Sequence, residues 1–493
     1  MASATDKRAS TQALESETSF LLRLGSDLLE LIVQLLLDDA QDENSATSSL
    51  STITRISHVC STLRHVLISR LSFWNSIRCT EDTRMDAVVA QLDRAGDVPL
   101  QIDMQRGTRS LSAVKQYPTD NNEVFAALFQ QMHRAAKVRI NAQSRQMTAF
   151  DHAASEPHVT LLPYAERPLE ELELHLTRVG NLLELIGPKC TKLVLRKLYT
   201  SHLFVKDLEA ALAAAPALGS LTIEHIKFEE SNSINRLTTS GAGFESPCQT
   251  LKELVLTAVE PLYTILPLIL RLFPGTALLG QAVQIGETEY DSWDHPESIV
   301  QMLQLSSLGP PNAMYIVEDG DEYQVNFPNG INRKFSLPEY FDYHADQQSR
   351  NIVLGLLNST TKLTIVDGDT FRFDSWLQSW YGSTWSSVTS LQIYLEHGDH
   401  QTGPQDMPMS NPSHRIYLPN LKEFVVTGHY YDYERMWATE CAILLDTFVF
   451  PNHVVVDLRD VICWSSIVAT DRIQKAVNDV YRIHHGRAYF TER

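Results

Sequence analysis

The chain has 493 residues, of which 43% are hydrophobic and 20% are charged, a balance typical of a globular protein with two or three domains. Its 60 acidic residues outnumber 41 basic ones, which gives a formal net charge of −19. Because such a surface repels nucleic-acid phosphates and anionic lipid headgroups, we expect no nucleic acid and no membrane as a partner. The charge hints instead at basic targets.

The cysteines and the apolar runs indicate in which part of the cell the protein is located. Six cysteines lie far apart without a C-x-x-C pair, which predicts reduced thiols rather than a disulfide framework or a zinc site. Residues 1–19 are polar and are expected to form a disordered leader without the apolar core of a signal peptide. The longest apolar runs fall short of the roughly 20 residues of a membrane span. We therefore expect a cytoplasmic or nuclear protein.

Residues 20–80 are expected to form a small helical unit. A first helix, started by Ser26 or Asp27, carries apolar residues at helical spacing. These residues are Leu24, Leu28, Leu31, Ile32, Leu35 and Leu36, with Leu21, Leu29 and Val33 widening the face. The polar residues 38–51 predict a flexible loop. A second helix has the apolar residues Ile53, Ile56, Val59, Cys60, Leu63 and Val66, and Leu71, Trp74 and Ile77 close the unit.

This unit has more apolar surface than it can bury by itself. Three short helices of about 50 residues enclose too little volume for so many leucines. We expect the excess to pack against the helices of a partner protein. The alternative is that these residues only pack the unit onto the rest of the same chain.

Three ordered blocks of this unit resemble the F-box. They are LGSDLLELI (24–32), VCSTLR (59–64) and FWNSI (73–77). Gly25 stands where the family usually has proline, and Leu63 stands where an aromatic residue is usual. The polar insert and LDRAGDVPLQIDM (92–104) are similar to segments of many fungal F-box proteins, so the resemblance covers roughly residues 21–104.

The resemblance implies a partner and a set of site residues. The partner would be the Skp-type adaptor of an SCF ubiquitin ligase, and through it the cullin. The adaptor-facing or adaptor-supporting residues would be Leu24, Leu28, Ile32, Leu35, Val59, Cys60, Leu63 and Trp74.

The rest of the chain alternates β-like runs with helical stretches. We expect strands within 169–176, 192–198, 218–226, 251–259, 362–366, 388–395, 421–428 and 453–460. Spacings such as 21 residues from Leu172 to Leu193 and 28 from Leu193 to Leu221 are typical of a leucine-rich-repeat solenoid. Residues 314–327 predict a hairpin at Asp319-Gly320 that interrupts the repeats.

The expected fold class is therefore α/β, with a three-helix F-box unit followed by an irregular leucine-rich-repeat-like solenoid with a hairpin insertion. Residues 81–160 would link the two and hold the first irregular repeats, and 161–493 would form the degenerate solenoid. An ordinary α/β domain with several βα units remains the alternative.

A search for catalytic motifs finds none. No phosphate-binding loop and no G-x-S-x-G elbow is present. His397, Asp399 and His400 are best explained as a polar loop, and the acidic residues 318–322 as a hairpin tip. We expect no metal, no cofactor and no enzymatic activity.

These observations predict a non-catalytic substrate-receptor subunit of an SCF-type ubiquitin ligase, with an unknown protein target bound by the C-terminal part. One alternative is an F-box-tethered scaffold protein without a role in ubiquitin transfer. Another is an α/β enzyme whose motif is not recognisable. The aromatic segments 371–382 and 429–437 are either anchors for a partner or packed core.

Overall fold

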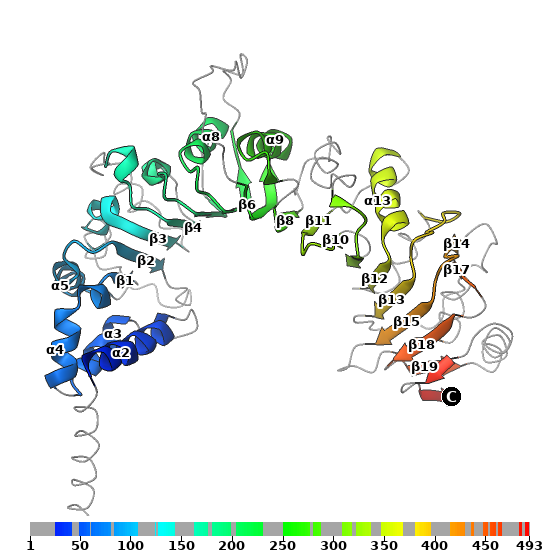
Figure 1. Cartoon of the computed structure of the whole chain (residues 1–493), viewed down its shortest axis with the longest axis horizontal. Helices are drawn as coiled ribbons and strands as arrows, with labels where there is room; N and C mark the ends of the chain where they lie inside the picture. Colours follow the sequence, from blue (N-terminus) through cyan, green and yellow to red (C-terminus); the bar gives the residue numbers. More distant parts are fainter. Residues whose placement is uncertain are drawn as a thin grey trace, which may run out of the picture. The chain divides into compact units, whose positions relative to one another are not determined.

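The structure is a computed structural model of the whole chain, which forms two compact units, residues 1–249 and 250–493 (Figure 1). Each unit contains helices and a mostly parallel sheet. The described residues are 25–41, 49–59, 61–79, 83–106, 124, 127–142, 162–175, 180–198, 204–229, 250–276, 280–286, 308–317, 322–336, 347–367, 380–395, 415–428, 435–437, 447–451, 454–459, 462–465, 483–485 and 489–492. The predicted leader 1–19 lies outside them.

The first unit begins with a group of short helices. They are α2 (Ser26–Gln41), α3 (Ser49–Ser57), α4 (Ser61–Ser69) and the 3-10 helix η1 (Leu71–Trp74). The Gly25 carbonyl accepts the amide N–H groups of Leu28 and Leu29, each at 3.1 Å. The first helix therefore starts at Ser26 as expected, without the proline that the F-box pattern usually has at position 25.

The predicted second helix is wrong, because the chain turns after Ser57 and forms two helices, α3 and α4. The Val59 N–H bonds to the Ile56 carbonyl three residues back, at 3.1 Å. The Ser57 carbonyl, at the end of α3, accepts the Arg64 Nε at 2.9 Å. A side chain of α4 thus caps α3, which a pattern of apolar spacings does not reveal.

Two further boundaries differ from the expectation. Residues 38–51 are not all loop, because α2 continues to Gln41 and α3 begins at Ser49. Polar composition suits the solvent-exposed end of a helix as well as it suits a loop. Ile77, expected to close the helical unit, belongs to the first strand of the sheet.

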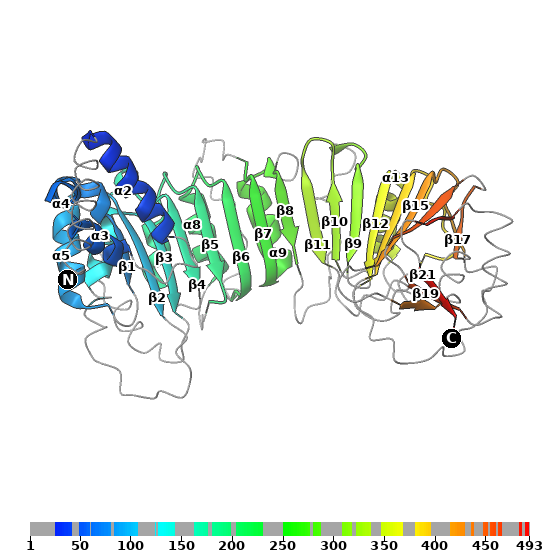
Figure 2. The same ribbon diagram turned by 90° about the horizontal axis from the view of Figure 1, so that it is seen from below.

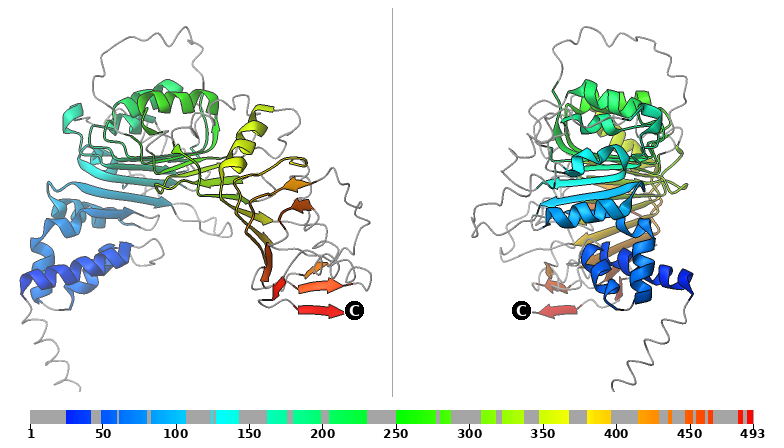
Figure 3. Two further views of the ribbon diagram at one scale, coloured as in Figure 1. Left: turned by 45° about the vertical axis from the view of Figure 1, so that its right-hand side comes forward. Right: turned by 90° about the vertical axis from the view of Figure 1, so that its left-hand side faces the viewer.

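The sheet of the first unit contains six parallel strands, and each pairs with the next one along the chain (Figure 2). They are β1 (Ser76–Cys79), β2 (Leu100–Arg106), β3 (Ala135–Ala142), β4 (Glu171–His175), β5 (Lys192–Arg196) and β6 (Ser220–Lys227). Helices α5 (Met85–Ala95) and α8 (Val205–Ala213) lie on one side of these strands (Figures 1 and 3).

The core of this unit is made of two rows of buried side chains that run across the strands. Successive residues of a strand point to opposite faces, so the residues in register form continuous rows. The rows are Ile77, Ile102, Val138, Leu172, Leu193 and Leu221, and Cys79, Met104, Ile140, Leu174, Leu195 and Ile223. All these side chains are buried, and each contributes about 1.5–3 kcal/mol by leaving water.

A repeated hydrogen-bond arrangement joins neighbouring strands. The carbonyl of the residue before one strand accepts two amide N–H groups at the start of the next. Glu170 receives those of Thr191 and Lys192, and Thr361 receives those of Thr389 and Ser390. The Thr191 and Thr389 hydroxyls donate to the same carbonyls, at 3.2 and 3.1 Å. These bonds fix the register in which the apolar rows align.

The second unit has a sheet with the strand order β7-β8-β11-β10-β9-β12-β13-β15-β18-β20. These strands are β7 (Glu253–Glu260), β8 (Ala282–Ile285), β9 (Ala313–Val317), β10 (Glu322–Asn326), β11 (Asn332–Ser336), β12 (Lys362–Asp367), β13 (Ser390–Leu395), β15 (Glu423–Gly428), β18 (Val455–Arg459) and β20 (Ile483–His485). Helices α9 (Leu262–Leu272) and α13 (Gln347–Ser359) and two small sheets complete the described part. The small sheets pair β14 (Ile416–Tyr417) with β17 (Phe448–Val449), and β16 (Arg435–Trp437), β19 (Ile462–Ser465) and β21 (Tyr489–Glu492) with one another.

The predicted hairpin is confirmed, because β9 and β10 pair antiparallel. The third strand of this insertion was not predicted: β11 pairs antiparallel with β10 and parallel with β8. The turn between β10 and β11 contains Asn329-Gly330, with Gly330 at φ +73°, a pair that commonly forms such turns. The insertion is therefore a three-stranded meander.

All eight strands predicted between residues 169 and 460 are confirmed, three in the first unit and five in the second. The mixed α/β class is confirmed as well. In the aromatic segment 371–382, Trp380 is fully buried and belongs to the core. Among the described residues, no helix combines the length and the apolar character needed to cross a membrane.

The two described buried cysteines should be chemically inert. Burial raises the pKa of the Cys79 and Cys190 thiols to about 12, so neither forms the reactive thiolate near neutral pH. We expect iodoacetamide at pH 8 to leave both unlabelled in the native protein and to label both in 6 M guanidinium chloride, as peptide mapping by mass spectrometry would show. Native labelling at the unfolded rate would contradict the burial of these thiols.

Candidate functional site

Helix α2 carries two apolar stripes, and only one of them is covered by the chain. Leu29 and Val33 are at most 2% exposed on a helix that packs against α3 and α4. Leu28, Leu31, Leu35 and Leu36 are 45–59% exposed. From the sequence, Leu29 and Val33 are expected only to widen a single apolar face of the helix. In the structure they form a separate, buried face.

The exposed leucines of α2 lie close together on the helix. Leu28, Leu31 and Leu35 are spaced at i, i+3 and i+7, which puts them on one side. Ile32 is half-buried beside them. A short surface helix normally turns such a stripe inward, so an outward-facing stripe of leucines is unusual.

Neighbouring elements add exposed apolar side chains. Arg70, which directly follows α4, forms an ion pair with Glu30 of α2 at 2.8 Å. This pair joins the segment between α4 and η1 to α2. Ile68 and Leu71 flank this arginine and are 55% and 45% exposed, and Val59 is 54% exposed. We name the whole set the apolar surface: Leu28, Leu31, Leu35, Leu36, Val59, Ile68 and Leu71. Figure 2 shows α2 beside α3 and α4.

The structure divides the predicted adaptor-binding residues into three groups. Leu28, Leu35 and Val59 are exposed and Ile32 is half-buried, as a contact surface requires. Leu63 and Trp74 are buried within this chain, so they are supporting residues and not contact residues. Leu24 and Cys60 lie outside the described residues.

Trp74 shows what such support consists of. Its indole N–H donates to the Leu67 carbonyl at 2.8 Å, so its polar group is satisfied although the ring is buried. The Arg94 guanidinium of α5 lies over the ring, 4.4 Å from its centre. Trp74 therefore fixes α4 against α5 and keeps the apolar surface in place.

Four members of the apolar surface were not among the predicted contacts: Leu31, Leu36, Ile68 and Leu71. Leu31 could have been found, because it shares the spacing of Leu28 and Leu35. Ile68 and Leu71 could not, because their position near α2 depends on how separate helices pack against one another.

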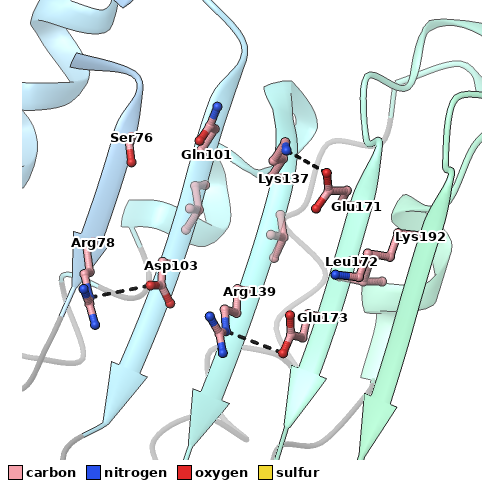
Figure 4. Close-up of a pocket in the computed structure, with 12 residues that line it drawn as sticks. Ser76, Arg78, Gln101, Asp103, Lys137, Arg139, Glu171, Leu172, Glu173 and Lys192 are labelled. Carbon is pink, nitrogen blue, oxygen red and sulfur yellow. Dashed lines mark ion pairs between the residues drawn. The ribbon is translucent and has the colours of Figure 1, made fainter. Parts of the chain in front are cut away.

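A second site lies on the sheet of the first unit. It is on the polar face of this sheet, opposite the side that helices α5 and α8 cover. A pocket of about 300 Å³ is lined by residues of β1 to β5 (Figure 4). Its charged side chains are Arg78, Asp103, Lys137, Arg139, Glu171, Glu173 and Lys192. Three ion pairs cross between neighbouring strands: Arg78–Asp103 at 3.6 Å, Lys137–Glu171 at 2.6 Å and Arg139–Glu173 at 3.5 Å.

Asp103 is the most perturbed charged group of this pocket. Burial raises the pKa of its carboxyl above the usual value, against the lowering effect of Arg78, Arg139 and the Gln105 amide. Gln105 donates to Oδ2 at 2.9 Å. Oδ1 is buried and accepts no hydrogen bond from the described residues.

Neither site has the parts of a metal centre. No group of three or more His, Cys, Asp and Glu side chains is placed to hold a metal ion in the described ranges. The weak candidates His397–His400 and Glu318–Asp321 lie outside those ranges.

A scan against protein-family models found no matching family, and a search of curated proteins found no match. The F-box resemblance of residues 21–104 therefore stays a prediction.

The two stripes of α2 predict effects of very different size for the same kind of substitution. Val33→Asp places a carboxylate in a fully buried position and should lower the free energy of unfolding by more than about 3 kcal/mol. Leu35→Asp, two residues along the helix, should change it by less than about 1 kcal/mol. Thermal or urea unfolding followed by circular dichroism would measure both, and equal losses would show that Leu35 is not exposed.

Proposed function

We propose that this protein is a non-catalytic substrate-receptor subunit of an SCF-type ubiquitin ligase. Its N-terminal helices would dock the Skp-type adaptor, and through it the cullin, while the strand-rich part holds a target protein. The observation that carries the proposal is the exposed leucine stripe of α2.

An exposed stripe of this kind favours a protein partner. Soluble proteins rarely leave a contiguous group of large apolar side chains in water unless a partner covers it. Full burial of one leucine contributes about 1.5–3 kcal/mol. Covering the exposed half of four leucines would therefore offset part of the entropy lost on association. The i, i+3, i+7 spacing suits helix-to-helix packing.

The resemblance gives this surface its proposed partner. Leu28 and Leu31 of the stripe lie in the first F-box-like block, Leu35 lies three residues beyond it, and Val59 opens the second block. Leu63 and Trp74, also in these blocks, hold the helices from within. The block residues thus divide into contacts and supports, as a docking module requires.

The strand-rich part supports the proposal of an irregular leucine-rich-repeat-like solenoid. Strands β1 to β6 pair in chain order, and the leucines predicted to be equivalent, Leu172, Leu193 and Leu221, occupy one row. The repeated carbonyl arrangement before successive strands points the same way. An ordinary α/β domain commonly reorders its strands instead.

Such a protein would act by proximity. Holding a target near the ubiquitin-carrying enzyme raises the effective concentration of the target lysine, which accelerates transfer without any side-chain chemistry from the receptor.

An F-box-tethered scaffold is the second candidate function, because the apolar surface would bind the adaptor equally well without ubiquitin transfer. Accumulation of a bound protein after loss of adaptor binding separates the two. An α/β enzyme with an unrecognised motif is a third candidate, and adaptor binding would argue against it.

Adaptor binding can be tested directly with Leu35→Asp. We expect the native full-length chain to co-purify with a Skp-type adaptor and Leu35→Asp to weaken the complex at least tenfold, because the carboxylate stays unpaired in an apolar interface. Calorimetry with purified adaptor would measure the affinity.

Val89→Asp is the matched control. Val89 is an exposed apolar residue of helix α5, outside the apolar surface, so this variant should bind the adaptor normally. Equal binding by the native chain and Leu35→Asp, or no binding by the native chain, would refute the proposal. Deletion of residues 21–78 is a poorer test, because it removes most of β1.

A further inference from the structure

The pocket on the polar face of β1 to β5 contributes nothing to the apolar surface, so its chemistry needs a separate explanation. Its cross-strand ion pairs are partly exposed, and pairs of this kind contribute little to the stability of a fold because water screens them. Stability alone therefore does not account for seven charged side chains at one place.

The pocket has a local excess of positive charge. Four of its charged side chains are cationic and three are anionic, although the whole chain carries a net charge of −19. The three anions take part in the three cross-strand ion pairs. Lys192 is left over: its side chain is exposed, and its ammonium group forms no ion pair with any described residue. Figure 4 shows it directed across β4. The uncompensated charge favours an anionic ligand.

Asp103 places a second requirement on the ligand, which has to donate a hydrogen bond to it. Its buried Oδ1 lacks a hydrogen-bond donor among the described residues, and a buried acceptor without a donor is costly. The guanidinium groups of Arg78 and Arg139 already flank this carboxyl, so a third cation would be repelled. A neutral N–H group fits, and a peptide backbone supplies one.

The spacing of the cations matches an extended chain. Lys137 and Lys192 lie in one row across the strands, and Arg78 and Arg139 lie in the next row on the same face. Rows two residues apart are separated by about 6.6 Å along the strands. Alternate side chains of an extended peptide have the same separation.

We propose that this pocket binds an extended acidic segment of a partner protein. Carboxylates at alternate positions of the segment face Lys192 and the neighbouring cations, and one of its backbone N–H groups donates to Asp103. This inference goes beyond the proposed function and holds with or without ubiquitin transfer. If the protein is a ligase receptor, the segment is part of its target.

The direct test uses a ten-residue peptide of alternating Glu and Ser with blocked termini and a fluorescent label. Fluorescence anisotropy with the full chain should show saturable binding that weakens from 50 to 500 mM NaCl. A peptide of alternating Lys and Ser should not bind. Absence of saturable binding by the acidic peptide, or equal binding by both peptides, overturns the proposal.

Lys192→Glu and Lys362→Glu form a matched pair of variants. Both lysines are exposed first residues of parallel strands, β5 and β12, and both substitutions change the net charge equally. Lys192→Glu should weaken peptide binding about tenfold, and Lys362→Glu should change it less than twofold. Equal effects would mean that the peptide senses only the net charge, which overturns the site.

Asp103→Ala separates a specific site from simple attraction. Removing this carboxylate makes the pocket more positive, so attraction alone would strengthen the binding of the acidic peptide. Loss of an acceptor for the peptide N–H would weaken it, and we expect about a fivefold loss. Stronger binding by Asp103→Ala would overturn the assigned role of Asp103.

The Leu35→Asp variant, which tests adaptor binding, also separates the two proposals. Leu35→Asp should bind the acidic peptide as the native chain does, because its side chain is outside the pocket. Failure of the adaptor experiment and failure of the peptide experiment therefore give different patterns, and each proposal can be lost without the other.

Discussion

The structure of both units depends on the register between neighbouring parallel strands. A strand of four to eight residues gains little stability alone, because half of its side chains face away from the core. In register, the inward-facing residues of successive strands form unbroken rows, such as Ile77 to Leu221, that no single strand could bury. The carbonyl and threonine bonds at the strand starts hold this register. The helices then cover one face of the rows.

The same constraint creates the polar pocket. Because the side-chain period of a strand is two, every residue that enters an apolar row places its neighbours on the opposite face. Alignment of Leu172 with Val138 therefore also aligns Glu171 with Lys137 and Glu173 with Arg139. The ion pairs of the pocket follow from the packing of the core. Lys192 has no ion-pair partner among the described residues, because Glu171, its neighbour on β4, already pairs with Lys137.

The arrangement of the N-terminal helices has a different physical cause, which is the limited area that they can cover. Helix α2 is apolar around much of its circumference, and α3 and α4 are too short to cover both sides of it. Leu29 and Val33 take the buried positions, which leaves Leu28, Leu31 and Leu35 to water. In the proposed receptor this gives two separate binding surfaces with opposite chemistry. The adaptor would be held by apolar contact, and an acidic segment by charge and hydrogen bonds.

The sequence by itself determined the class of the fold, eight of the strands that follow residue 168 and the β9–β10 hairpin, because period-two patterns and turn residues act locally. It also indicated that the first helix has more apolar surface than its unit can bury. It did not determine which stripe of α2 is buried, the break between α3 and α4, or the positions of Ile68 and Leu71, because contacts between helices decide these. The pocket depended most on tertiary structure. Arg78, Asp103, Arg139 and Glu173 are far apart in the chain, and only the register of four strands brings them together.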